Sequence, residues 1–136
     1  MTGRILPIPD ETSVPFWAAC AEHVLTLPRC GPCGAYTLPP DVVCPHCKST
    51  EPAWRYEPVP GRGKLRTWTV VRHSFLQGFE LPFVLADVEL DVQQDLRMIG
   101  RLLDGAEAPL QIGDRVEVAF EELAPGVAIP SFRRVS

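Results

Sequence analysis

Four cysteines stand in two closely spaced pairs near the N-terminus. Cys30-Gly-Pro-Cys33 is followed, after ten residues, by Cys44-Pro-His-Cys47. Each CxxC turn directs two sulfurs towards one point, and two such turns supply the four thiolates that a tetrahedral zinc ion takes. Because protein sulfur would fill every coordination position, the predicted zinc is structural and not catalytic. The spacing therefore predicts one structural zinc ion bound by Cys30, Cys33, Cys44 and Cys47.

Other uses of these cysteines fit the sequence less well. Two disulfides need an oxidising compartment, and a redox CxxC normally occurs once, beside a βαβ unit that this sequence lacks. A rubredoxin-type iron site uses the same spacing and stays open as an alternative. His46, inside the second pair, is not counted as a ligand, and Cys20 is interpreted as a small core residue.

The cysteine-rich segment has its own composition. Residues 28–56 are rich in Pro and Gly and poor in long hydrophobic runs, so burial of hydrophobic side chains alone cannot fold them. We interpret them as a zinc ribbon domain. An N-terminal arm and helix (1–27) precede it, and a β domain (57–136) follows it.

An N-terminal helix is predicted to begin after Ser13, with Pro15 in its first turn, and to run to about His23 or Leu25. Its hydrophobic residues recur at spacings of three and four. This face either packs on its own domain or docks another subunit. Phe16 and Trp17 are the candidate partner-binding residues.

The C-terminal part has the alternation of β-strands. Residues 65–75 are rich in β-branched and aromatic residues, side chains alternate between two faces in 83–90, 96–103 and 115–120, and a last strand is expected over 127–135. Glycine-containing turns separate most of these strands. Five strands without a second long helix predict a small barrel such as an OB-fold, or a small sandwich. Gly100 inside a strand suits the strong bend of a small barrel. The predicted fold is thus mainly β: an N-terminal helix, a small zinc ribbon and a five-stranded OB-fold-like barrel.

The net charge and the absence of catalytic motifs argue against several classes of function. The net charge of −4 argues against a nucleic-acid binder, which usually presents a basic face. We expect no membrane span, no secretory signal and a cytoplasmic location. The chain contains no GxSxG, HExxH or phosphate-binding glycine loop, so it is not expected to be an enzyme on its own.

Two ligand-binding alternatives rest on the first barrel strand and the loop after it. A solvated, alternating strand edge is the preferred interpretation of its basic residues. They are nevertheless candidates for binding the phosphates of an acyl-CoA: Arg62, Lys64, Arg66 and Arg72. Three aromatic residues are candidates for stacking the bases of a single-stranded nucleic acid: Trp68, Phe75 and Phe79.

Several local motifs, taken together, resemble one family. The ribbon from Arg29 to Cys47 is followed by the turn Pro60-Gly61-Arg62-Gly63, which leads into the strand 67–71. Leu81-Pro82-Phe83-Val84 and Ile112-Gly113-Asp114 precede two later strands, and the chain closes on Pro130-Ser131-Phe132-Arg133. This combination resembles the acyl-CoA-associated OB-fold family with a rubredoxin-like zinc ribbon, also known as domain of unknown function 35. Arg134 stands where that family has a proline.

The resemblance implies an accessory subunit. Members of this family accompany thiolase-fold enzymes, such as sterol side-chain aldolases and Claisen-type condensing enzymes, or MaoC-type enoyl-CoA hydratases. The zinc ribbon and helix commonly contact the partner. The resemblance therefore implies a hetero-oligomer in which the partner holds the catalytic residues.

Overall fold

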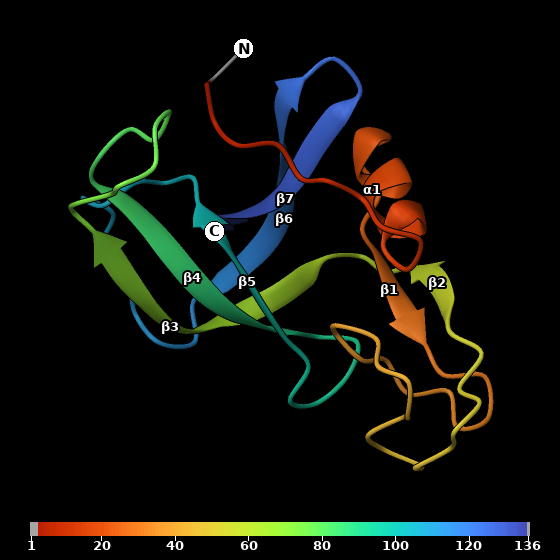
Figure 1. The fold of residues 1–136 in the computed structure, drawn as a ribbon. Coiled ribbons are helices and arrows are strands. Elements are labelled where there is room, and N and C mark those ends of the chain that lie inside the picture. Colours follow the sequence, from red (N-terminus) through yellow and green to blue (C-terminus); the bar gives the residue numbers. More distant parts are fainter. Residues whose placement is uncertain (1–2, 136) are drawn as a thin grey trace.

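Five strands in the C-terminal two thirds of the chain close into a barrel (Figure 1). The computed structural model describes residues 3–135, so Met1, Thr2 and Ser136, at the ends of the predicted arm and β domain, lie outside the described residues. Around the barrel the strands follow the order β3 (Arg62–Val71), β4 (Phe83–Leu90), β5 (Arg97–Leu102), β7 (Val127–Arg134) and β6 (Arg115–Ala124), which returns to β3.

The pairing of these strands is that of an OB-fold. The β5–β7 pair is parallel, and the other neighbouring pairs are antiparallel. A five-stranded closed barrel with this order confirms the predicted fold and excludes the sandwich alternative. The five predicted strands correspond to β3 to β7.

A β-bulge divides β3 into two halves. The register with β4 shifts between Leu65 and Thr67, so Arg66 is the extra residue. Before the bulge Leu65 is buried, and after it Trp68 and Val70 pack against the same core. The bulge reverses which residues of β3 point into the core. Every second residue counted from Arg62 therefore does not lie on the same face of the strand.

The helix is shorter than predicted. α1 runs from Val14 to Ala21, whereas we expected it to reach His23 or Leu25. His23 adopts a left-handed φ of 60°, and the amides of Val24 and His23 donate back to the carbonyls of Ala19 and Cys20. This is a Schellman ending, with His in the position that usually holds glycine. Val24 and Leu25 therefore do not lie on the helix face.

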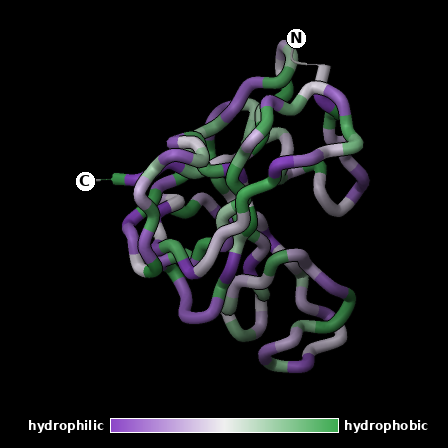
Figure 2. Tube along the Cα trace, turned by 90° about the vertical axis from the view of Figure 1, so that its left-hand side faces the viewer, coloured by the Kyte–Doolittle hydropathy of each residue, from purple (hydrophilic) through white to green (hydrophobic). Residues whose placement is uncertain are grey.

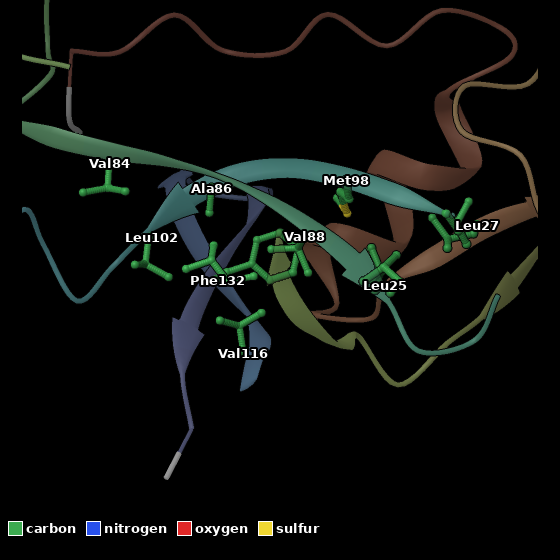
Figure 3. Packing of buried hydrophobic residues seen from close by; sticks show 12 residues of the cluster. Leu25, Leu27, Val84, Ala86, Val88, Met98, Leu102, Val116 and Phe132 are labelled. Carbon is green, nitrogen blue, oxygen red and sulfur yellow. The ribbon is translucent and has the colours of Figure 1, made fainter. Parts of the chain in front are cut away.

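A short ladder, absent from the sequence-based assignment, joins the ribbon to the barrel. β1 (Thr26–Arg29) pairs antiparallel with β2 (Arg55–Pro58), and the proposed ribbon limits of 28 and 56 fall inside these strands. Leu25 and Leu27 are buried with Val88 and Phe132 in the barrel core (Figure 3). The base of the ribbon is thus anchored by buried hydrophobic side chains, whereas its tip adds only the partly buried Tyr36 and Leu38 to the edge of this core.

The ribbon tip extends from the end of this ladder (Figure 1). Along it, hydrophobic and hydrophilic segments alternate without a continuous hydrophobic stretch (Figure 2). Within residues 3–135, no helix is long and apolar enough to cross a membrane.

Candidate metal centre and partner-facing surfaces

The four cysteines converge at the ribbon tip. Their Sγ atoms all lie within 4.8 Å of one another, and the Cys30–Cys47 and Cys33–Cys44 sulfur pairs are each separated by 3.8 Å. Zn–S bonds of 2.3 Å in a regular tetrahedron place neighbouring sulfurs about 3.8 Å apart. The donor set and its spacing therefore fit one four-coordinate zinc ion.

The two CxxC turns repeat the same backbone pattern. The Gly34 amide donates to the Cys30 carbonyl at 2.8 Å, and the Lys48 amide donates to the Cys44 carbonyl at 2.9 Å. Each of these residues has a left-handed φ, 77° for Gly34 and 64° for Lys48. Glycine adopts this conformation without strain, whereas lysine does not. The second turn keeps its shape partly through a hydrogen bond from Lys48 Nζ to the Pro45 carbonyl at 2.8 Å.

The electrostatics of the site favour bound metal. Burial raises the pKa of the Cys30 thiol to about 12, and the neighbouring sulfurs contribute to the rise. Burial also opposes ionisation of Cys44, but the amides of Cys47 and His46 donate to its sulfur, and its pKa falls to about 6. Without a cation, four thiolates at this spacing would repel one another. A zinc ion removes this repulsion, and the two amides stabilise the bound thiolate.

Arg29 stabilises the first CxxC turn, a role that the sequence analysis did not predict. Its Nε donates to the Gly34 carbonyl at 2.7 Å, and its Nη1 donates to Glu57 at 2.9 Å. The guanidinium also lies 5.2 Å from the centre of the Tyr36 ring. The sequence feature that could have identified Arg29 is its position directly before Cys30, because the chain passes there from the β1–β2 ladder into the first CxxC turn.

A single barrel side chain also holds the ribbon. Gln93, in the β4–β5 turn, accepts from the Tyr36 amide and donates to the Tyr36 carbonyl, both at 2.8 Å. The side-chain amide thereby extends the ribbon's backbone pairing onto the barrel. No motif marks this glutamine in the sequence.

The structure separates the two candidate partner-binding aromatics. Phe16 packs against the barrel core, while Trp17 lines a pocket of about 280 Å³ between the N-terminal arm, α1 and the β6–β7 turn. The two rings meet edge to face at 4.9 Å. Phe16 thus contributes to the edge of the core, and both side chains remain partly accessible.

The four candidate CoA-binding residues do not form one cationic patch. Arg66 lies 3.1 Å and Lys64 3.8 Å from the buried carboxylate of Glu89. The Asp95 amide donates to Glu89, and this bond together with the two cations lowers the pKa of Glu89. Arg62 is exposed on the same half of β3, and Arg72 lies beyond the bulge, after the far end of the strand.

The aromatic residues considered for base stacking are also dispersed. Trp68 packs against the core, and Phe79 stacks on Phe83 beneath the Arg4 guanidinium. Phe75 is 94% exposed and has His73 beside it. No row of accessible rings forms among these three residues.

Comparison with known proteins agrees with this architecture. Residues 17–53 match the family model for the ChsH2 rubredoxin-like zinc ribbon domain, and residues 56–121 match that for the ChsH2 C-terminal OB-fold domain. A solved chain described as Ltp2-ChsH2(DUF35) aldolase superposes with a TM-score of 0.81 at 29% identity, covering 94% of this chain and 98% of the other.

Two curated relatives carry different names. A DUF35 domain-containing scaffold protein of Methanothermobacter thermautotrophicus is 26% identical over 75% of this chain and 75% of its own length. A probable enoyl-CoA hydratase alpha subunit of Thermomonospora curvata is 32% identical over 87% of this chain. The present chain spans only 36% of that subunit's length.

These matches identify the metal and the family. A zinc ribbon model over the four cysteines, together with their tetrahedral spacing, confirms the prediction of one structural zinc ion. The two models together cover most of the helix, the ribbon and the barrel as far as β6. The chain therefore belongs to the ChsH2, or DUF35, family, in which a rubredoxin-like zinc ribbon precedes an OB-fold domain.

Proposed function

We propose that this chain is a non-catalytic accessory subunit of an acyl-CoA-processing complex, with a thiolase-fold enzyme as its partner. The partner is a sterol side-chain aldolase or a Claisen-type condensing enzyme. The observation that carries this proposal is the end-to-end match to the chain described as Ltp2-ChsH2(DUF35) aldolase, which covers 98% of that chain. The scaffold name of the archaeal relative supports the same role.

The chemistry of the chain supports an assembly role. The zinc ion has four protein ligands and leaves no position for water or substrate. The histidines lie apart: His23 pairs with Glu122 and His73 contacts Phe75, whereas His46 is exposed within the metal turn. The reacting groups are therefore supplied by the partner, while the zinc ribbon and helix of this chain contact it.

A second candidate partner is a MaoC-type enoyl-CoA hydratase. The hydratase alpha subunit of Thermomonospora curvata favours it, because that relative is 32% identical, against 29% for the aldolase-associated chain. Its match involves about a third of the subunit, so the name reflects a longer protein. The aldolase-type partner is preferred because that match spans both chains almost completely.

The proposal also covers acyl-CoA binding and the location of the protein in the cell. Any acyl-CoA is bound mainly by the partner, since Lys64 and Arg66 of this chain are already paired with Glu89. A cytoplasmic location suits four thiols that must stay reduced to bind metal.

Co-expression with the products of neighbouring genes tests the proposal. We expect a thiolase-type enzyme to co-purify with this chain and to be identified by mass spectrometry. Cys44→Ser, which removes one zinc ligand, should abolish the complex. A partner that is soluble and fully active without this chain would contradict the proposal, and co-purification of a hydratase instead would select the second candidate.

A further inference from the structure

A groove runs between the start of α1 and the zinc ribbon. Its volume is about 670 Å³, within the range of sites that enclose ligands. One wall comes from the turn before the helix and its first residues, and the other comes from the ribbon. The lining residues are Glu11, Thr12, Pro15, Pro40, Asp41, Val42, Thr50, Pro52, Ala53, Trp54 and Tyr56.

Two hydrogen bonds from aromatic side chains to backbone carbonyls hold the walls in place. The Tyr56 hydroxyl donates to the Thr12 carbonyl at 2.7 Å, which ties β2 to the helix start. The Trp54 indole N–H donates to the Asp41 carbonyl at 2.7 Å, which ties the two sides of the ribbon together. The polar atoms of both side chains are thus satisfied within the protein, and their rings supply hydrophobic lining.

The edge of the groove is negatively charged. Glu11 and Asp41 are exposed at its edge, and neither has a cationic partner among residues 3–135. No Lys, Arg or His lines it. Val42, which is 80% exposed, adds a hydrophobic side chain next to Asp41. An anionic ligand such as CoA would be repelled here, whereas a hydrophobic segment carrying Lys or Arg would be attracted.

We propose that this groove is the docking site for an extended segment of the partner enzyme that carries hydrophobic side chains next to Lys or Arg. The hydrophobic side chains lie against Trp54, Tyr56 and Val42, and the cations pair with Glu11 and Asp41. The inference rests on the proposed function and adds to it the surface and the chemistry of the partner segment. It also gives a physical reason for the expected loss of the complex in Cys44→Ser, because the metal holds the ribbon wall in place.

Charge reversal at the edge tests the electrostatic part. When mixed with partner enzyme released from the co-expressed complex, the double variant Glu11→Lys/Asp41→Lys should associate about ten-fold more slowly than the wild type at low salt. The wild-type rate should fall as NaCl is raised, while the variant's rate should change little. The matched control is Glu80→Lys/Glu107→Lys, which changes the net charge equally in barrel loops and should associate like the wild type.

A second pair of variants tests the hydrophobic contact. Val42→Ser should weaken partner binding about ten-fold, measured by interferometry or calorimetry. Ile112→Ser, at a residue that is 75% exposed in the β5–β6 connection, should have no effect. Both positions are exposed, so both variants should fold normally.

The outcomes separate the two proposals. If the wild-type chain forms the complex and the groove variants bind like their controls, the groove assignment is wrong and the accessory role stands. If the wild-type chain forms no complex with a thiolase-type or hydratase enzyme, the accessory role fails and the groove proposal fails with it.

Discussion

Gly100 shows how one missing side chain allows the barrel to close. A Cβ at this position would lie 2.9 Å from the ring of Phe132, the largest fully buried side chain. Gly100 is on β5 and Phe132 on β7, the pair that forms the parallel contact of the barrel. Only a residue without a side chain leaves room for the ring at this closure.

Gly100→Ala should therefore destabilise the protein by about 1–3 kcal/mol, because the added methyl group overpacks the core. Urea unfolding followed by fluorescence measures the change. Adding Phe132→Leu should recover part of the loss, because a smaller side chain frees space near the new methyl group. Equal stability of Gly100→Ala and wild type would show that the core can relax around it.

Glu121 is a half-buried carboxylate that connects the N-terminal arm with the barrel. It accepts from Arg101 at 2.7 Å, from Arg4 at 3.2 Å and from the Ser131 hydroxyl. Burial opposes its ionisation, but Ser131, Arg101 and Arg4 outweigh burial and lower its pKa below the ordinary 4.5. Folding is thus coupled to the ionised form.

The pH dependence of stability follows from this lowered pKa. The stabilisation from Glu121 should be complete above pH 4.5, its ordinary pKa, and should be lost as the pH falls through the lower folded-state value. Glu121→Gln should cost about 2 kcal/mol at pH 7, and the difference from wild type should shrink below pH 4.5. Thermal unfolding between pH 7 and 3.5 measures it, with Glu107→Gln as the exposed control. A difference that does not change with pH would contradict the ionic role.

At the scale of elements, the β4–β5 turn and the ribbon are joined by the two hydrogen bonds of Gln93 to Tyr36. Gln93→Ala should cost about 1–3 kcal/mol, because each intramolecular hydrogen bond contributes about 0.5–1.5 kcal/mol. The effect should be local: the Tyr36 amide should exchange faster with solvent, measured by hydrogen–deuterium exchange, while amides in β6 and β7 stay protected. Gln94→Ala, at the exposed neighbouring residue, should leave Tyr36 unchanged.

The elements also show what the sequence could predict. Period-two alternation predicted β4, β5 and β6, because each buries one face in a common core. β3 was predicted from its β-branched and aromatic residues. The β1–β2 ladder escaped prediction because both strands are four residues long and include a proline. The helix end escaped because it depends on a left-handed His23, for which the residue type gives little signal.

The candidate site divides in the same way. Metal-ligand spacing is a local property, so the four cysteines could be read directly from the sequence. The pairing of Lys64 and Arg66 with Glu89 could not be predicted, because it depends on the β3–β4 register. That register includes a bulge for which the residue types give no signal. The groove between α1 and the ribbon likewise depends on how distant segments meet.

At the scale of the whole molecule, hydrophobic packing stabilises the barrel and zinc binding stabilises the ribbon tip, and the β1–β2 ladder connects the two. The barrel and the base of the ribbon share a hydrophobic core that includes Leu25, Leu27 and Phe132. The ribbon tip from Cys30 to Trp54 contributes only Tyr36 and Leu38 to the edge of that core. It is otherwise held by the metal site and by individual hydrogen bonds, among them those of Gln93 to Tyr36. The free energy that folds the tip must therefore come largely from zinc binding.

Removing zinc should consequently unfold the tip and leave the barrel folded. After treatment with a strong chelator, amides of residues 30–54 should lose protection in hydrogen–deuterium exchange, whereas those of β3 to β7 should keep it. Leu25 and Leu27 should hold β1 against the barrel, so the boundary of the loss should lie within the β1–β2 ladder. Adding back one equivalent of zinc should restore protection, and Cys44→Ser should resemble the chelated protein. Unfolding of the barrel together with the tip would show that the ladder transmits the loss, and that ribbon and barrel form a single cooperative unit.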